Sequence, residues 1–271
     1  MIRVRPGRRY PPRPFDPRAT TGPAGSPPRE AILTRSDRPA DAFRPIHFER
    51  QFTEQSAGSV LVTCGRTKIL CTVSVLDGVP QWMSGSGKAW LSAEYSMLPG
   101  ATRSRKSREG RMGRVDARSL EIQRIIGRAL RSVIELKGMP ELTLWVDCDV
   151  LEADGGTRTT AINGACVALH DALTSLRTAG RLRQWPMQGL VSAISVGLVG
   201  GEFLVDLEYK EDAAADVDLN VVRLDDGRLV EVQGTAERRA FTDAELRRML
   251  ELAETACQQI SALQAQALGT R

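Results

Sequence analysis

A glycine turn between a predicted strand and a predicted helix is the first candidate site in the chain. Residues 150–159 read VLEADGGTRT, so Gly155 and Gly156 precede Thr157 and Arg158. Glycines let a backbone turn tightly and bring its N–H groups close to a ligand. The start of a helix adds free N–H groups, and a guanidinium adds a planar charged fork. The pattern predicts an anion site for phosphate; the alternative is an ordinary turn followed by a solvated arginine.

A basic segment lies upstream of this turn, over residues 103–114. It holds six basic side chains against the single Glu109, with two glycines and no apolar face. The basic residues are Arg103, Arg105, Lys106, Arg108, Arg111 and Arg114. We expect a mobile loop that guides a polyanion such as RNA; solvated surface charge is the alternative.

An acidic segment, DLEYKEDAAADVDLN, begins at Asp206. Its carboxylates belong to Asp206, Glu208, Glu211, Asp212, Asp216 and Asp218. Asp216 and Asp218 are two positions apart on a predicted strand and share a face, and Asp212 lies on the short loop before it. Converging carboxylates either bind a hard cation such as Mg²⁺ or remain as solvated charge at a sheet edge. The segment therefore predicts a candidate metal site.

Other kinds of site are disfavoured by the residues present. Gly85-Ser86-Gly87-Lys88 looks like the end of a P-loop, but Trp82 and Ala89 stand where a glycine and a hydroxyl residue are required. The chain has two histidines and five cysteines with no CxxC pair, which argues against a zinc site and a Ser-His-Asp hydrolase. We expect the cysteines to be reduced, mostly buried thiols of a cytoplasmic protein.

The composition is that of a soluble globular protein, with 42% hydrophobic and 26% charged residues among 271. No apolar run approaches the ~18 residues that span a bilayer, so no membrane partner is expected. The net charge of +4 comes from the first 30 residues, which hold seven arginines against two acidic residues and eight of the fourteen prolines. We predict that residues 1–33 form a disordered Arg/Pro-rich tail. An RNA-binding arm is one interpretation, and an extension without function is the one we favour.

Hydrophobic periodicity predicts the elements that position these sites. Alternation over 142–150 indicates a strand before the glycine turn, and helical spacing over 162–176 indicates a helix after it. Two hairpins are predicted over 59–75 and 193–209, with the second turning at Gly200-Gly201.

Long amphipathic helices are predicted near 118–137 and 243–268. Thr242 and Glu245 form the capping box of the second helix. A last strand pair, 217–223 and 228–233, turns through Asp225-Asp226-Gly227. The chain is predicted to be α+β, with mixed β-sheets, long amphipathic helices and an internal βαβ pseudo-repeat.

Together these parts form a phosphate cradle, a carboxylate metal site and a basic strand-guiding loop. This combination favours phosphoryl or nucleotidyl transfer on a nucleic-acid backbone. No obvious nucleophile or histidine base is present, which favours an attacking group that is already an anion. Positioning and charge neutralisation would then supply most of the catalysis.

The chain resembles the ribonuclease PH family of phosphorolytic 3′→5′ exoribonucleases, from about Arg38 to Leu268. The resemblance rests on the segments GSVLVTCGRTKILCTVSV, WLSAEYSMLPG, RSLEIQRIIGRALR, VDCDVLEADGGTRTTAINGACVAL, EDAAADVDLNVV and VEVQGTAE. It implies an RNase PH-type fold, with residues 34–271 as the catalytic domain. It also implies that the protein trims the 3′ ends of tRNA precursors with inorganic phosphate, reversibly, and releases nucleoside diphosphates.

The resemblance also assigns roles to residues of this chain. It implies phosphate binding by Arg118, Gly156, Thr157 and Arg158, and both arginines count among the catalytic residues. Asp212 and Asp218 would bind Mg²⁺ or a similar divalent cation and take part in catalysis. Arg103, Arg105 and Arg108 would bind RNA. A homohexamer built as a trimer of dimers is expected.

The sequence departs from the family pattern near some of these residues. Ala117 and Ser119 flank Arg118 where the family usually has glycine and threonine, and Gly100 stands where a basic residue is frequent. A catalytically silent RNA-binding ring subunit of exosome type is the alternative function. Loss of a phosphate-site arginine or a metal aspartate would favour it, and here all four residues are present. Hydrolysis in place of phosphorolysis is a third interpretation.

Overall fold

The computed structural model describes residues 35–108 and 116–270. The predicted tail (residues 1–33) and residues 109–115 of the basic segment lie outside the described residues.

The first sheet contains five strands in the order β1-β2-β3-β5-β4. Their bounds are β1 Ile46–Arg50, β2 Gly58–Cys64, β3 Thr67–Asp77, β4 Trp90–Met97 and β5 Leu142–Glu152. Neighbouring strands are antiparallel except β4 and β5, which are parallel and connected through α1 (Ala117–Arg131). A short 3₁₀ turn, Gln81–Met83, lies in the connection before β4.

The second sheet contains four antiparallel strands in the order β7-β6-β8-β9. Their bounds are β6 Val191–Val199, β7 Glu202–Val205, β8 Val217–Leu224 and β9 Leu229–Ala236. A helix of six residues, α3 (Tyr209–Ala214), connects β7 to β8.

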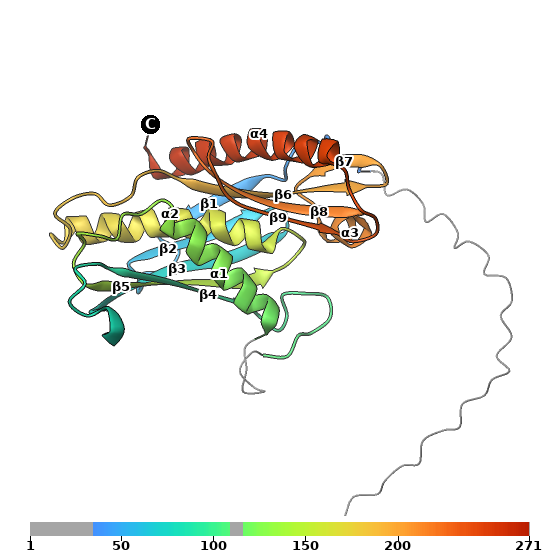
Figure 1. Cartoon of the computed structure of the whole chain (residues 1–271). Coiled ribbons are helices and arrows are strands. Elements are labelled where there is room, and N and C mark those ends of the chain that lie inside the picture. The colour runs from blue at the N-terminus through green and yellow to red at the C-terminus, as the bar shows by residue number, and fades with distance from the viewer. Residues whose placement is uncertain (1–34, 109–115, 271) are drawn as a thin grey trace, which may run out of the picture. The chain divides into compact units, whose positions relative to one another are not determined.

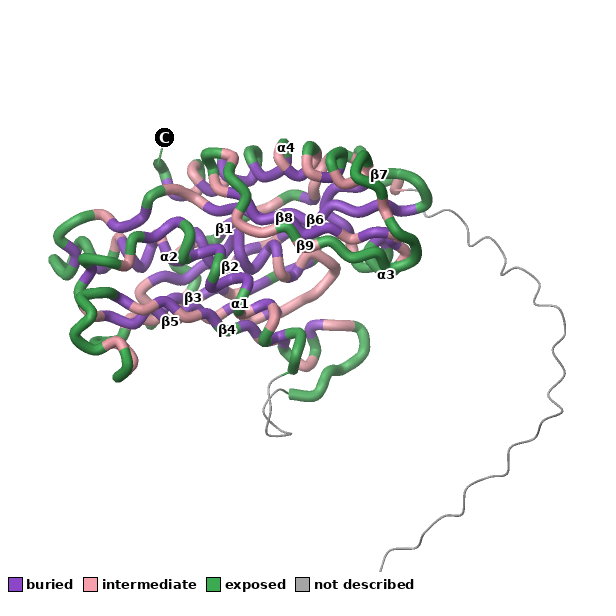
Figure 2. The backbone as a smooth tube through the Cα atoms, viewed as in Figure 1, coloured by how far each residue is buried: buried purple, intermediate pink, exposed green. Residues whose placement is uncertain are grey.

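The central helix α2 (Thr157–Thr178) packs on β2 and β3 of the first sheet and on β6 of the second. The last helix, α4 (Asp243–Leu268), covers the opposite face of the second sheet (Figure 1). This layering explains why α2 is buried on nearly every side and why β6 is buried at all nine positions (Figure 2). The start of α2 is consequently held firmly against two sheets.

Two glycines allow α2 to lie close to the first sheet. A Cβ on Gly58 of β2 would overlap the backbone carbonyl oxygen of Ala168. A Cβ on Gly164 of α2 would overlap the side chain of Val62 and lie 2.8 Å from Cys71 Sγ. The helix therefore fits only where these side chains are missing.

The predicted α+β class with mixed sheets is confirmed, as are the hairpins and the helix that follows the glycine turn. Thr242 and Glu245 form the predicted capping box at the start of α4. All five cysteines are free and buried. The two hairpins that suggested a repeat lie in different sheets, and the βαβ unit is β4-α1-β5.

Two local predictions were wrong. Helix α1 ends at Arg131, not near residue 137. The chain then extends, and Glu135 N–H donates to the Pro186 carbonyl while Gln188 N–H donates to the Val133 carbonyl. Asp212 lies in α3 rather than in a loop, because Glu208 and Glu211 form a capping box that starts this helix.

None of the helices in the described part of the chain is long and apolar enough to cross a membrane.

Gly58→Ala should destabilise the protein by about 1–3 kcal/mol, because a backbone oxygen of a buried helix cannot move aside cheaply. Gly100→Ala is the matched control, since a Cβ there meets no atom within 4 Å, and it should change stability by less than ~0.5 kcal/mol. Urea unfolding followed by circular dichroism measures both. Equal midpoints for the two variants would show that the close contact between α2 and the first sheet is not required.

Candidate active site

The glycine turn before α2 has the backbone geometry that an anion site requires. Gly155 and Gly156 have φ values of +78° and +63°, in the left-handed region that favours glycine. A Cβ on Gly155 would also overlap the Leu207 carbonyl oxygen. Gly156 is the N-cap of α2, and no side-chain hydrogen bond caps the helix there. The first N–H groups of α2 are thus available to a ligand.

These residues line a cleft of about 800 Å³. Its walls come from the glycine turn, the loop after β4, the first turn of α1 and the start of α3. The charged lining residues are Arg66, Arg103, Lys106, Arg118, Glu152, Asp154, Glu208, Lys210 and Asp212. The structure therefore brings five predicted site residues to one cleft: Arg103, Arg118, Gly156, Thr157 and Asp212.

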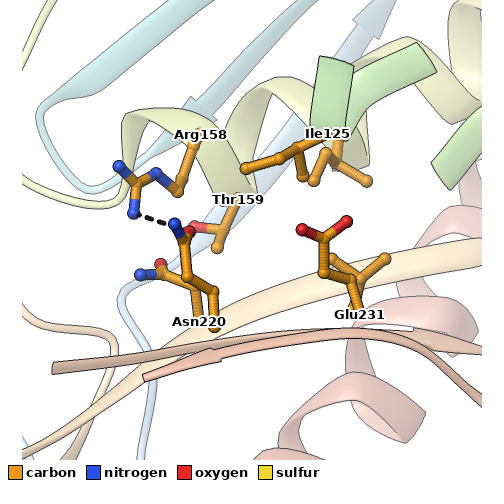
Figure 3. A pocket seen from close by; sticks show the side chains of 8 residues that line it. Ile125, Arg158, Thr159, Asn220 and Glu231 are labelled. Carbon is orange, nitrogen blue, oxygen red and sulfur yellow. Dashed lines mark hydrogen bonds between the residues drawn. The ribbon is translucent and has the colours of Figure 1, made fainter. Parts of the chain in front are cut away.

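The Arg158 side chain does not point into this cleft, although the sequence predicts that it binds phosphate together with Arg118. Its amide belongs to the first turn of α2, but its side chain lines a separate small cavity beside Asn220 and Glu231 (Figure 3). Arg158 Nη1 donates to Gln233 Oε1 at 3.4 Å (dashed line in Figure 3), and Nη2 lies 3.7 Å from Glu121 Oε1. The structure does not place the Arg118 and Arg158 side chains together in the cleft.

Two carboxylates of the acidic segment form ion pairs with buried arginine side chains. Asp206 pairs with Arg44 at 2.7 Å, and Glu211 pairs with Arg35 at 2.7 Å. Glu208 is the N-cap of α3 and shares the capping box with Glu211. Paired and hydrogen-bonded carboxylates are poor candidates for binding a cation.

Asp212, Asp216 and Asp218 remain, and the negative charge of Asp212 acts on Asp218. Burial and the negative charge of Asp212 raise the pKa of Asp218 to about 6, against the effects of Arg158 and a hydrogen bond from Asn220. Asp212 is exposed to the cleft, yet the surrounding protein displaces part of its water and raises its pKa. Arg118 and Arg158 oppose that increase.

The described residues contain no group of three or more His, Cys, Asp or Glu side chains that could hold a metal ion. A metal at Asp212 and Asp218 would need water or substrate oxygens as its other ligands. Mg²⁺ accepts this arrangement, because it commonly binds one or two carboxylates together with substrate phosphates.

The buried Tyr95 side chain forms a hydrogen bond with the side chain of Thr157. The Tyr95 hydroxyl is buried and lies 2.9 Å from Thr157 Oγ1. Because the Tyr95 hydroxyl donates this hydrogen bond, the Thr157 hydroxyl keeps its own proton for a ligand. Burial raises the pKa of Tyr95, so it stays a neutral donor. The alternation of β4 predicts that Tyr95 points inward, but nothing in the sequence indicates that it contacts Thr157.

The basic loop is only partly at the cleft. Arg103 and Lys106 line it, whereas Arg105 and Arg108 are exposed and do not. The Lys106 N–H donates to the Pro99 carbonyl at 2.9 Å, which closes a turn over this part of the loop. Arg66 and Lys210 also line the cleft and were not singled out from the sequence.

Comparison with known families divides the chain into two parts. Residues 42–174 match the model of the 3′ exoribonuclease family, domain 1. Residues 189–256 match domain 2 of the same family. The first match contains the glycine turn and Arg118, and the second contains Asp212 and Asp218.

Solved structures share the fold at low identity. A rice (Oryza sativa) Rrp46 has a TM-score of 0.69 and 21% identity, over 86% of this chain and 98% of that chain. An Archaeoglobus fulgidus exosome with RNA bound to the active site has a TM-score of 0.68 and 19% identity, over 82% and 89%. An archaeal exosome core has a TM-score of 0.66 and 18% identity, over 83% and 87%.

Asp218→Asn should stabilise the metal-free protein at about pH 8. In the folded protein the pKa of Asp218 is about 6, whereas the ordinary pKa of an aspartate is 3.8. The folded state therefore binds more protons between these values, and stability falls as the pH rises through that window. Thermal unfolding in EDTA should give the variant a higher midpoint than wild type at about pH 8 and an equal one near pH 4. A variant no more stable than wild type at the higher pH would contradict the raised pKa.

Proposed function

Because this chain belongs to the 3′ exoribonuclease family, we propose that it is a phosphate-dependent 3′→5′ exoribonuclease that trims the 3′ ends of tRNA precursors. The observation that carries the proposal is a single cleft lined by the glycine turn, Arg118 and Asp212. The cleft combines donors suited to an anion with a carboxylate, as phosphoryl transfer requires.

Inorganic phosphate would bind the N–H groups of Gly156 and Thr157 and the guanidinium of Arg118. One of its oxygens attacks the last phosphodiester of the RNA, and a new P–O–P linkage forms. The bond to the 3′ oxygen of the preceding ribose breaks, and that oxygen takes up a proton. A nucleoside diphosphate leaves. Since phosphate is already an anion, no side-chain base is needed, and the reaction can run backwards as nucleotide addition.

Asp212 and Asp218 would hold Mg²⁺. Burial and the charge of Asp212 make the ionisation of Asp218 costly, and a cation held by both carboxylates would offset that cost. When bound, the ion supplies charge neutralisation at the transferring phosphorus. Arg158 would act here through its charge, which favours ionisation of both carboxylates.

The RNA would follow the basic loop to the cleft. Arg103 lines the cleft, and Arg105 and Arg108 continue the basic surface on the exposed part of the loop. We further propose that the protein is a homohexamer, a trimer of dimers, and that it works in the cytoplasm. Resemblance to the ribonuclease PH family supports the hexamer.

A catalytically silent RNA-binding ring subunit of exosome type is the second candidate. It is favoured by the fold shared with a rice Rrp46 and two archaeal exosome structures. Against it, Arg118, Arg158, Asp212 and Asp218 are all present. The two candidates differ in turnover, so one assay separates them.

Labelled RNA with a tRNA-type 3′ end should release nucleoside diphosphates only when inorganic phosphate is supplied. Arg118→Ala should slow this release at least ~10-fold, because it removes charged hydrogen bonds worth about 1.5–3 kcal/mol. Arg247→Ala, an exposed arginine on α4, is the control and should retain wild-type turnover. Release of monophosphates without phosphate would identify a hydrolase, and RNA binding without release would identify a silent subunit.

Magnesium affinity should depend on pH through Asp218. Its pKa of about 6 implies that Mg²⁺ binding, measured by calorimetry without RNA, weakens roughly fourfold from about pH 7.5 to about pH 5.5. Asp218→Asn should bind Mg²⁺ more weakly and lose most of this pH dependence. Equal affinity of the wild type at both pH values would argue against Asp218 as a ligand.

A further inference from the structure

A buried ion pair lies directly behind the glycine turn. Arg44 is 5% exposed and Asp206 is 1% exposed. Arg44 donates from Nε to Asp206 Oδ2 and from Nη2 to Asp206 Oδ1, both at 2.7 Å, and its backbone N–H donates to Oδ2 at 2.8 Å. The pair is close to the turn itself, since a Cβ on Gly156 would lie 3.2 Å from Arg44 Nη2.

The remaining donors of Arg44 bind carbonyl groups of the turn. Nη1 donates to the Asp154 carbonyl at 2.5 Å, and Nη2 lies 3.5 Å from the Gly155 carbonyl oxygen. Thr67 binds the same backbone from β3. Its hydroxyl donates to the Gly155 carbonyl at 2.8 Å and accepts from the Asp154 N–H at 2.9 Å.

Holding these carbonyls determines where the next amide points. In a planar trans peptide the C=O and N–H groups point in opposite directions. The Gly155 carbonyl points to Thr67 and Arg44, so the N–H of Gly156 points away from them, and both glycines line the cleft.

Asp206 also begins the segment that leads to Asp212. Its φ of +58° is unusual for a residue other than glycine, and its N–H donates to the Ser195 carbonyl at 2.7 Å. The backbone of Leu207 and Glu208, which follow Asp206, packs closely against Gly155. Glu208 is then the N-cap of α3. The ion pair therefore joins the turn that would bind phosphate to the segment that carries a candidate metal ligand.

We propose that Arg44, Asp206 and Thr67 are positioning residues, which preorganise the glycine turn to bind phosphate and fix its place relative to Asp212. The proposal rests on the proposed function for its kinetic consequences, but phosphate binding tests it separately. Preorganised donors bind an anion without first having to be ordered, so loosening the turn should weaken phosphate binding more than it slows the chemical step.

The chain supplies a matched control for the loss of a paired aspartate. Arg50 and Asp171 form a second bidentate pair, with Nε 2.9 Å from Oδ2 and Nη2 2.5 Å from Oδ1. Neither residue lines the cleft. Asp206→Asn and Asp171→Asn make the same chemical change, and asparagine tolerates the left-handed backbone at residue 206. Thr67→Val is a milder variant that keeps the shape and removes the hydroxyl.

The test measures KM for inorganic phosphate and kcat in phosphorolysis, together with Kd for inorganic phosphate by calorimetry without RNA. Asp206→Asn should raise KM and Kd at least roughly fivefold and Thr67→Val at least roughly threefold, with smaller falls in kcat. Asp171→Asn should leave KM, Kd and kcat within about twofold of wild type, even if its thermal midpoint falls as far as that of Asp206→Asn.

Wild-type phosphate KM and Kd in folded Asp206→Asn and Thr67→Val would overturn the proposal and leave a purely structural ion pair. If Asp206→Asn does not fold, Thr67→Val decides alone. A wild-type protein that binds phosphate but releases no diphosphate would refute the proposed function, and Kd would still decide the role of the positioning residues. A wild-type protein that binds no phosphate would overturn both.

Discussion

The uncapped amide groups at the start of α2 are the feature on which the rest of the site depends. Gly156 has no side chain to cap the helix, and the turn has the left-handed backbone that glycine adopts without strain. The first sheet supports this turn through Thr67, and the chain before β1 supports it through Arg44. Because α2 is packed between two sheets, the donors are held in one place and an anion is their natural partner.

The carboxylates of the acidic segment have two kinds of role. Asp206 and Glu211 are buried against arginines from the N-terminal part of the described chain, and these pairs fix the segment around α3. Burial instead raises the pKa of Asp212 and, together with the charge of Asp212, makes the ionisation of Asp218 costly. A carboxylate kept in an unfavourable place is typical of a functional site, since a bound cation relieves the cost.

Local signals in the sequence predicted local structure well. The glycine turn, the hairpins and the Thr242 capping box each depend on a few neighbouring residues, and all are present. The end of α1 was missed because apolar spacing continues through Val133, although that residue is buried in a bend that follows the last residue of the helix. The Arg44–Asp206 pair joins residues 162 positions apart, and no local pattern marks either partner. The direction of the Arg158 side chain likewise depends on tertiary neighbours.

Crystals of the protein grown or soaked with phosphate or sulfate test the central claim most directly. The account predicts an anion in the cleft, bound by the N–H groups of Gly156 and Thr157 and by the Arg118 guanidinium. The carbonyls of Asp154 and Gly155 should still bind Arg44 and Thr67 in that structure. A cleft with no anion at saturating concentration, with Arg118 turned into solvent, would contradict the account.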